Sequence, residues 1–347
     1  MRHSLRAMAK SEAITIEAAG REVRISNPAK LFFPEPGFTK LDLVHYYLEC
    51  EQAVLRHLRE RPTTLKRWVD GVTGEFFFQK RVPDGAPEWL TTATVQFPSG
   101  RSARELVVSD AAHLAWGVNL GVIDWNPWAV RRRDLDRPDE LRIDLDPTPG
   151  VSFDEVRAVA ACVREVLDEH GLVGFPKTSG SRGVHVNVRV HPQRRFEEVR
   201  LAAVALAREV ERRMPGRATS KWWKEERVGV FVDYNQNARD RTVASAYSVR
   251  AVADARVSCP VEWDELPDVD PAELRLDTVP GRLRDRGDPS ATIDEHAGSL
   301  DSLLELAARD SAAGLPDAPW PPNFPKGPDE ATRVAPSRAK GRRAQRS

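Results

Sequence analysis

The stretch LRIDLDP, residues 141–147, sets two carboxylates two positions apart in an otherwise apolar run. In a β-strand, residues i and i+2 point to the same face, so Asp144 and Asp146 lie side by side while Ile143 and Leu145 face the other way. Two such carboxylates repel each other and raise each other's pKa unless a cation lies between them. Mg²⁺ or Mn²⁺ removes that conflict, because both ions prefer carboxylate oxygens. On its own, the pair also fits a solvated or salt-bridged strand end.

A third carboxylate ends another strand-like run. Asp233 closes the apolar segment VGVFVD within the stretch VFVDYNQN. A pair of metal ions that clamps an in-line phosphoryl or nucleotidyl displacement commonly needs a third carboxylate. Asp233 is therefore the best candidate to join Asp144 and Asp146 in binding two Mg²⁺ or Mn²⁺ ions.

The turn TSGSRGVHV, residues 178–186, has the composition of a phosphate-binding turn. Its glycines let backbone N–H groups converge on an anion, Ser179 and Ser181 can donate to phosphate oxygens, and Arg182 carries a permanent charge. His185 follows on the polar face of the next strand. The G-x-x-x-x-G-K-[ST] spacing of a Walker loop is absent. An ordinary hairpin with an exposed arginine remains the alternative interpretation.

Further hydrogen-bond donors follow Asp233. They lie in the segment QNARDRTVASAYSVRA and comprise Gln236, Asn237, Arg239, Arg241 and Arg250. Such a cluster suits a metal-bound triphosphate, although these charges could also form a solvated face.

The order of elements around these motifs predicts an α+β fold. From residue 141 to 233 the pattern is strand, helix, strand, glycine-rich turn, strand, helix, strand, which favours a mixed or mainly antiparallel sheet with helices on one face. Before it, helical spacing runs from the N-cap candidate Thr39 to Leu58. A small sheet is expected over 61–100, DWNPWAVRRRD (124–134) is expected to be a loop, and the chain after about Pro280 is expected to continue as a polar connection.

Composition adds few constraints. Lys plus Arg equals Asp plus Glu at 52 each, so a polyanion-binding surface would have to arise locally. Three widely spaced cysteines and the absence of a membrane-length apolar run lead us to expect a cytoplasmic protein without a membrane partner. The stretch 331–347 has six basic residues and no acid, which fits a solvated end or an arm that contacts phosphates.

Three motifs occur in order along the chain: the D-x-D pair, SGSRGVHV, and VFVDYNQN with the later YSVRA. Together they resemble the three motifs of the polymerase domain of bacterial DNA ligase D, which belongs to the archaeo-eukaryotic primase superfamily. The resemblance covers roughly residues 20–300. It implies a catalytic core with an RRM-like mixed or antiparallel sheet flanked by helices, plus a smaller N-terminal subdomain that contains a sheet. Length and the Trp-Pro-rich basic end are most similar to stand-alone Prim-PolC-type members.

The resemblance also suggests domain limits. Residues 1–12 are expected to form a flexible arm, and residues 13–300 the primase-polymerase domain. Its N-terminal part would run over about 13–135 and its catalytic part over about 136–300. Residues 301–347 would hold a C-terminal helix, a Pro-rich segment and the basic tail.

Site residues carry over at matching positions. The three aspartates would bind the metals, and Phe77 and Phe78 would stack at the templating base. The resemblance implies nucleotide binding by Lys66, Phe78, Asn126, Ser179, Ser181, Arg182, His185, Gln236 and Arg250. It implies a pocket for a DNA 5′-phosphate at Asn27, Lys30 and Lys40. Strand alternation nevertheless predicts that at least one of Phe76, Phe77 and Phe78 is buried.

One position departs from the family pattern. Where relatives have E-I-H-P-W, this chain has Asp124 to Trp128 as DWNPW, so Asn126 replaces a histidine near the ribose. The choice between ribo- and deoxynucleotides is therefore left open. Trp222 and Trp223, between two lysines, suit either stacking on nucleic acid or a role in the core or a lid.

The expected function is template-directed nucleotidyl transfer that fills short gaps or extends primers in DNA repair. Its substrates would be gapped or primer-template DNA together with NTPs or dNTPs. Its partner would be a separate ATP-dependent DNA ligase or an end-binding protein, and it would be located at the nucleoid. A non-catalytic adaptor that binds DNA gaps or ends is the alternative, and a metal-dependent nuclease or phosphatase is a third. The adaptor would not need an intact carboxylate triad, and the hydrolases would not need a triphosphate cradle.

Overall fold

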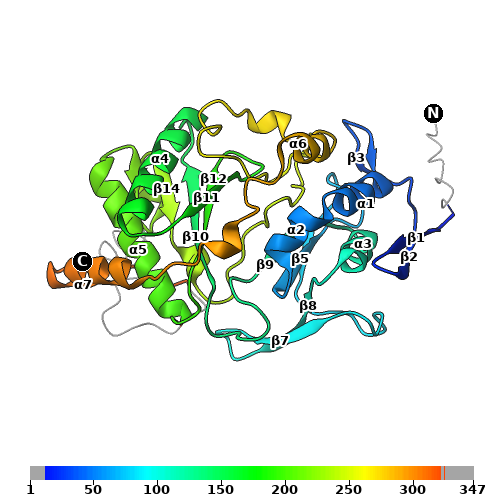
Figure 1. Cartoon of the computed structure of the whole chain (residues 1–347), viewed down its shortest axis with the longest axis horizontal. Helices are drawn as coiled ribbons and strands as arrows, with labels where there is room; N and C mark the ends of the chain where they lie inside the picture. Colours follow the sequence, from blue (N-terminus) through cyan, green and yellow to red (C-terminus); the bar gives the residue numbers. More distant parts are fainter. Residues whose placement is uncertain (1–11, 322–323, 325–347) are drawn as a thin grey trace, which may run out of the picture.

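The computed structural model describes residues 12–321 and residue 324, which form two five-stranded sheets and helices around them (Figure 1). The catalytic sheet has the order β11-β12-β10-β14-β13, and all its pairs are antiparallel except β13 with β14. Its strands are β10 (Glu140–Pro147), β11 (Gly174–Thr178), β12 (Val184–Arg189), β13 (Ala218–Thr219) and β14 (Val230–Asp233). The expected arm at 1–12 and the basic stretch at 331–347 lie almost entirely outside the described residues.

Two long helices cover one face of this sheet. In α4 (Phe153–Glu169), the N-cap Ser152 accepts from the backbone N–H of Glu155, and an apolar stripe is buried. In α5 (Phe196–Arg213), alanines and valines form the buried face. Both helices contact β10, and α7 (Asp301–Ala312) packs against α5. Figure 1 shows α4 and α5 on the side of the sheet away from β5 and β9. The predicted helices and their buried stripes are thus present.

The opposite face of the catalytic sheet is polar because of strand register. Residues directly opposite each other in antiparallel strands project to the same face. Lys177 lies opposite His185, His185 opposite Asp144, and Asp144 opposite Asp233. Four charged or titratable side chains therefore form a row across β11, β12, β10 and β14. Because Ile143 and Leu145 alternate with Asp144, they pack into the core instead.

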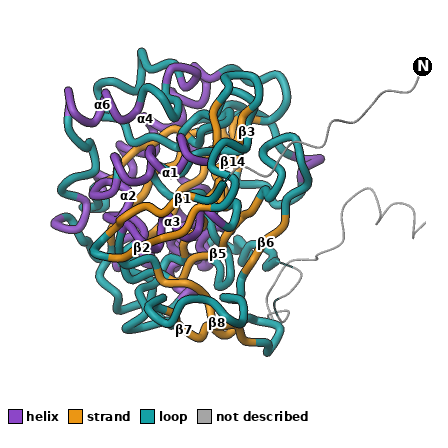
Figure 2. The backbone as a smooth tube through the Cα atoms, turned by 90° about the vertical axis from the view of Figure 1, so that its right-hand side faces the viewer, coloured by secondary structure: helices purple, strands orange, loops and turns teal. Residues whose placement is uncertain are grey.

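The second sheet belongs to the N-terminal part of the chain, which faces the viewer in Figure 2. It has the order β6-β5-β8-β7, and β9 also pairs with β5. Its strands are β5 (Pro62–Arg67), β6 (Phe77–Gln79), β7 (Thr92–Gln96), β8 (Ser102–Val107) and β9 (Val122–Pro127). The hairpins β1–β2 (Ile14–Ala18, Arg21–Ile25) and β3–β4 (Leu31–Phe33, Phe38–Thr39) lie beside it, with α1 (Lys40–Glu49), α2 (Glu51–Leu58) and α3 (Ala111–Asn119).

Three local expectations were wrong. The segment expected as a loop from 124 begins within β9, because Trp125 is buried and the strand pairs with β5. The helix expected to run to Leu58 is divided at Cys50 into α1 and α2. The region after Pro280, expected to be a polar connection, contains most of α6 (Val279–Arg286). In each case packing against distant residues overrides the local pattern.

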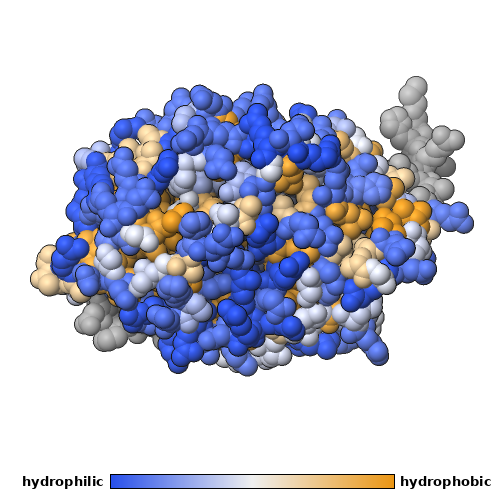
Figure 3. Space-filling model, viewed as in Figure 1, coloured by the Kyte–Doolittle hydropathy of each residue, from blue (hydrophilic) through white to orange (hydrophobic). Residues whose placement is uncertain are grey.

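The hydrophobic core is continuous between the two sheets, since one buried cluster includes residues of both. The division at about residue 135 therefore remains a prediction. The face seen in Figure 3 is mostly hydrophilic, with hydrophobic residues in limited patches. Across the described residues, every helix is too short or too polar to span a lipid bilayer.

Trp125 and Gly117 provide a test of this core. A Cβ atom on Gly117, within α3, would lie 2.2 Å from Cη2 of the fully buried Trp125. We expect Gly117→Ala to destabilise the protein by about 1–2 kcal/mol in urea unfolding, because overpacking outweighs the gain in helix propensity. Gly281→Ala in α6 is the matched control, since the nearest atom to its Cβ would be 3.7 Å away. That variant should be unchanged or more stable by about 0.4–1 kcal/mol. Equal stability of the two variants would contradict the close contact.

Candidate active site

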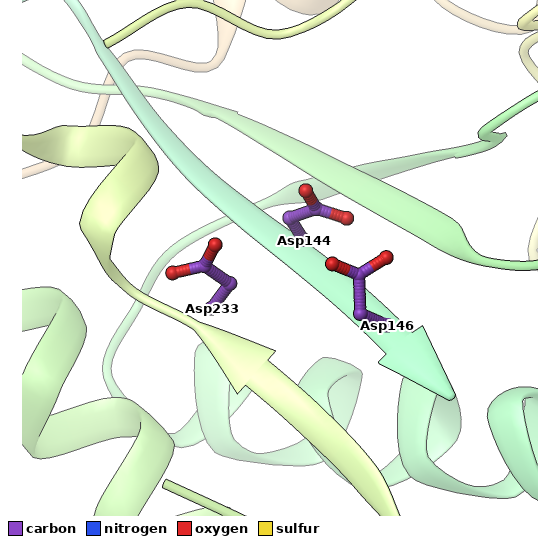
Figure 4. Close-up of side chains that lie close together, drawn as sticks. All are labelled: Asp144, Asp146 and Asp233. Carbon is purple, nitrogen blue, oxygen red and sulfur yellow. The ribbon is translucent and has the colours of Figure 1, made fainter. Parts of the chain in front are cut away.

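Three carboxylates converge at one end of the catalytic sheet. Asp144 and Asp146 project from β10 and Asp233 from the end of β14, as Figure 4 shows. A carboxylate oxygen of each lies within 4.8 Å of the others. Asp144 is buried, Asp233 half-buried and Asp146 exposed. Residues far apart in sequence thus meet because β10 and β14 are neighbours in the sheet.

The pKa values of the three carboxylates indicate that a cation would stabilise this triad. Burial raises the pKa of Asp144 to about 6 despite the nearby Lys177 and Arg250. Asp146 is exposed as a whole residue, but partial desolvation of its carboxylate, followed by the charges of Asp144 and Asp233, raises its pKa to about 6. Burial and the charge of Asp144 also raise the pKa of Asp233. Each shift means that the folded protein disfavours the charged carboxylates it brings together.

The donor set fits a hard divalent ion. Oδ1 of the buried Asp144 has no hydrogen-bond donor among the described residues. Nε2 of His185 approaches it to 3.2 Å without the alignment of a hydrogen bond. An unpaired buried carboxylate oxygen is costly, and Mg²⁺ or Mn²⁺ would take up such oxygens. The three aspartates would therefore hold the metal ions.

A buried lysine fixes the orientation of His185. Nζ of Lys177 contacts Nδ1 of His185 at 2.6 Å, the carbonyl of Ala244 at 3.0 Å and Oγ of Ser258 at 2.5 Å. Oγ of Ser258 donates to the carbonyl of Thr178, so it accepts from the lysine. Three acceptors match the three N–H groups of an ammonium. Burial lowers the pKa of Lys177 to about 7, and in its ammonium form Nζ donates to Nδ1 of His185, which leaves the imidazole proton on Nε2, facing Asp144.

The glycine-rich turn differs from the expected phosphate cradle. Oγ of Ser179 accepts from the backbone N–H groups of Ser181 (3.1 Å) and Gly183 (3.0 Å), so these donors are already used. The turn instead permits close packing. A Cβ on Gly183 would lie 2.3 Å from the carbonyl of Leu145. Arg182 is exposed and does not line the cavity described below.

A cavity of about 600 Å³ opens between the two sheets, over Asp144 and Asp146 of the triad. From the catalytic sheet and its following loop it is lined by Asp144, Asp146, Ser179, Ser181, His185, Gln236 and Arg250. From the N-terminal sheet it is lined by Thr64, Lys66, Phe78, Lys80, Asp124 and Asn126. Most of the predicted nucleotide-binding residues therefore surround one space, and cationic side chains face the carboxylates across it.

Several lining residues are held in place by neighbours. Nη1 of Arg250 donates to the carbonyl of Ser179 at 3.0 Å, and its Nε lies 3.4 Å from Oδ2 of the buried Asp124. Nε2 of Gln236 donates to Oδ2 of Asp233 at 3.0 Å, so Gln236 orients a carboxylate. Nδ2 of Asn126 donates to the carbonyl of Asp124.

The phenylalanines beside the cavity are all exposed. Phe76, Phe77 and Phe78 have exposed fractions of 50%, 45% and 57%, so the expectation that at least one is buried was wrong. The reason is that β6 is an edge strand paired only with β5. The Nζ atom of Lys66 lies 4.4 Å from the ring centre of Phe76 and 5.6 Å from that of Phe78. Phe77 points to the other face, against Arg67, and does not line the cavity.

The residues expected to bind a 5′-phosphate lie together but outside this cavity. The backbone N–H of Lys40 donates to the carbonyl of Lys30, and Nζ of Lys40 donates to the carbonyls of Ser26 and Asn119. Burial and the charge of Lys30 lower the pKa of Lys40 to about 8. Nζ of Lys30 pairs with Asp70 at 2.6 Å. Asn27, with φ of 49°, lies in the turn that closes onto Lys30.

Sequence reasoning missed lining residues such as Thr64 and Lys80, and it missed two residues, Lys177 and Asp124, that hold others in place. Lys177 was overlooked because its partner His185 is found only through the pairing of β11 with β12. Asp124 was noted only as a departure from a motif, whereas its carboxylate lies beside Arg250. The available sequence signal for Lys177 was a lysine in an extended apolar run. No local signal identified Asp124.

Replacing Asp144 tests the cost of burying its carboxylate in the triad. Folding raises the pKa of Asp144, so above pH 6 the carboxylate reduces stability, and removing its charge should increase it. After metal removal with EDTA at pH 7.5, we expect Asp144→Asn to raise Tm by about 2–4 °C, equivalent to about 1 kcal/mol. The same variant should bind Mn²⁺ at least tenfold more weakly in calorimetry. Asp84→Asn, at an exposed aspartate, is the control for both readouts. A lower Tm with unchanged Mn²⁺ affinity would contradict this interpretation.

Comparison with known proteins supports the same site. A family model described as the LigD primase-polymerase domain matches residues 39–290. The multifunctional non-homologous end joining protein LigD of Mycolicibacterium smegmatis is 33% identical over 307 residues, which cover 88% of this chain and 40% of that protein. LigD of Pseudomonas aeruginosa is 33% identical over 314 residues, covering 89% and 37%. This chain thus spans about 40% of these relatives' length.

A solved structure agrees in fold. The polymerase domain of Mycobacterium tuberculosis ligase D, determined in complex with DNA, superposes with a TM-score of 0.74 at 32% identity. The match covers 79% of this chain and 99% of that domain. The α+β prediction is confirmed, as is the resemblance inferred from the three motifs. The chain belongs to the LigD primase-polymerase domain family, a family of metal-dependent nucleotidyltransferases of DNA repair.

Proposed function

We propose that this chain fills short gaps and extends primers in DNA, adding NTPs or dNTPs opposite a template and releasing pyrophosphate. The observation that carries the proposal is the acidic triad beside a cavity to which the catalytic side also contributes Arg250, while the N-terminal sheet contributes Lys66 as a second wall. Carboxylates suit metal ions, and cations facing them suit the phosphates that such ions bind. A hydrolase would gain little from this second wall.

Each part of the site has a role in this reaction. Asp144, Asp146 and Asp233 would hold two Mn²⁺ or Mg²⁺ ions, which supply charge stabilisation and a more acidic primer 3′-hydroxyl. Arg250, oriented by Asp124 and the Ser179 carbonyl, would bind phosphate oxygens. His185 would donate from Nε2 and Lys66 would supply charge. Because nucleotidyl transfer is a direct displacement, positioning and electrostatics suffice without a protein nucleophile.

The remaining predicted roles fit the surroundings of the cavity. Exposed Phe78 offers a flat surface to a templating base inside the cavity, whereas Phe77, on the other face of β6, would stack on template DNA outside it. Ser179, Ser181 and Asn126 would hydrogen-bond the nucleotide. Arg182 would contact phosphate only from outside the cavity. Asn27, Lys30 and Lys40 would bind the 5′-phosphate across a gap, since the ammonium of Lys30 is close enough to lower the pKa of Lys40 and an anion would relieve that repulsion.

The wider setting follows from the relatives. Their names refer to non-homologous end joining, so we propose that this chain acts on broken or gapped DNA in end joining or short-gap excision repair. A separate ATP-dependent DNA ligase or an end-binding protein would complete the repair. This work would take place in the cytoplasm, on the nucleoid.

The test is single-nucleotide addition to a one-nucleotide DNA gap in Mn²⁺, with dNTPs and NTPs compared. We expect template-matched addition that requires the metal, increases with a 5′-phosphate at the gap, and falls at least 1000-fold in Asp144→Asn, a loss of about 4 kcal/mol in transition-state stabilisation. The sugar ratio will show the effect of Asn126. Tight gap binding without addition would instead favour the non-catalytic adaptor.

Lys177 should act as a positioning residue. Lys177→Met removes the donor to Nδ1 of His185, so the imidazole tautomer is no longer fixed. We expect kcat to fall about tenfold with a smaller change in the KM of the nucleotide. ¹⁵N NMR of the imidazole should show a mixture of tautomers. Ser258→Ala is the control, because it removes an acceptor of Lys177 and leaves His185 intact. An unchanged tautomer in Lys177→Met would refute the role.

A further inference from the structure

Phe324 lines the cavity although it lies 74 positions beyond Arg250, the next lining residue before it in the sequence. It comes from the C-terminal segment, here defined as residues 316–321 and Phe324. The apolar residues lining this otherwise polar cavity are Phe78, Val243, Ala244 and Phe324. The two aromatic rings therefore reach the same space from opposite ends of the chain.

A buried arginine anchors this segment. Arg200 of α5 is fully buried, and its Nη2 donates to the carbonyls of Ala318 (3.1 Å) and Pro319 (2.7 Å). The ring of Trp320 lies over the guanidinium, 4.2 Å from Cζ, and Nε1 of Trp320 donates to Asp317. A buried guanidinium is costly without such acceptors, so these contacts stabilise the segment in this position.

The anchor also connects to the metal-binding end of β14. Nη2 of Arg200 lies 3.3 Å from Oδ1 of Asn235, and the backbone N–H of Asn235 donates to Asp233 at 2.8 Å. Trp320 packs on Phe324, with ring centres 5.1 Å apart. A chain of direct contacts thus runs from the carboxylate triad to Phe324, which fixes the phenyl ring at the cavity wall.

We propose that Phe324 is a second base-stacking surface of the site, held in place by the Arg200 anchor, and that it binds a nucleobase of the substrate occupying the cavity. This inference rests on the proposed function. Stacking on an aromatic ring contributes about 1–3 kcal/mol per base and accepts every base, which suits a template-directed enzyme. The base belongs either to the incoming nucleotide or to the DNA strand beside it, and the two sources give different measurements.

Equilibrium binding separates this inference from catalysis. We would use gapped DNA with a dideoxy-terminated primer, so that binding is measured without turnover, and place 2-aminopurine at the templating position. DNA affinity is read by anisotropy, and nucleotide affinity by titration of the fluorescence change in Mn²⁺. In the full chain, Phe324→Ala should weaken one of these affinities by about 5- to 100-fold. Loss of nucleotide affinity alone identifies the incoming base, and loss of DNA affinity alone identifies a base of the DNA.

Matched substitutions distinguish stacking from packing. Phe324→Tyr keeps the aromatic ring and should restore affinity, whereas Phe324→Leu keeps apolar volume and should behave like Phe324→Ala. Thermal unfolding of each variant reports any loss of the contact with Trp320. If Phe324→Ala binds both ligands as the native chain does, or if Phe324→Leu restores binding, the inference is overturned. Single-nucleotide addition that persists in that case would leave the proposed function standing.

Discussion

The antiparallel register of β10 with its two neighbours is the constraint on which the site depends. It places Asp144 opposite Asp233 on one side and opposite His185 on the other. A shift of one residue would turn the carboxylates into the helix-covered core and bring Ile143 and Leu145 to the cavity. The apolar residues that alternate with the aspartates therefore determine where the charges lie. Burial beneath α4 and α5 holds the register, and the register brings like charges together despite their repulsion.

The other end of the same polar face carries charges that are fully paired. Arg142 donates to Glu140 and to the carbonyl of Pro127 at the end of β9, and Glu140 also pairs with Arg189. Burial alone would raise the pKa of Glu140, but the charges of Arg142 and Arg189 hold that pKa well below its usual value. This network joins the catalytic sheet to the N-terminal sheet. At one end of this face of β10 the charges are paired and connect the two sheets. At the other end the negative charges of the aspartates have no such partners, which suits a bound cation.

The elements around the triad show how far prediction from sequence could reach. The strand carrying the D-x-D pair, the helices α4 and α5, and the approach of Asp233 to the pair all followed from short-range patterns and motif order. The glycine-rich turn was located correctly, but its hydrogen bonding differs from that of the expected cradle. The hydroxyl of Ser179 accepts from the turn's own N–H groups, and Arg182 is not among the residues that line the cavity. A motif marks where a turn occurs, whereas competition among neighbouring donors decides which groups remain available.

By itself, the sequence determined the alternation of apolar and charged residues, the helical stripes and the family of the fold, because these depend on spacing along the chain. Apart from the approach of Asp233 to the D-x-D pair, only the tertiary structure decided which distant residues meet. Lys177 contacts His185 through the pairing of β11 with β12, Asp124 contacts Arg250 where the two sheets meet, and Arg200 anchors the segment that carries Phe324 to the cavity wall. These contacts depend on strand order and on the docking of one sheet against another. Both are set by the burial of the whole core, and no local stretch of sequence encodes them.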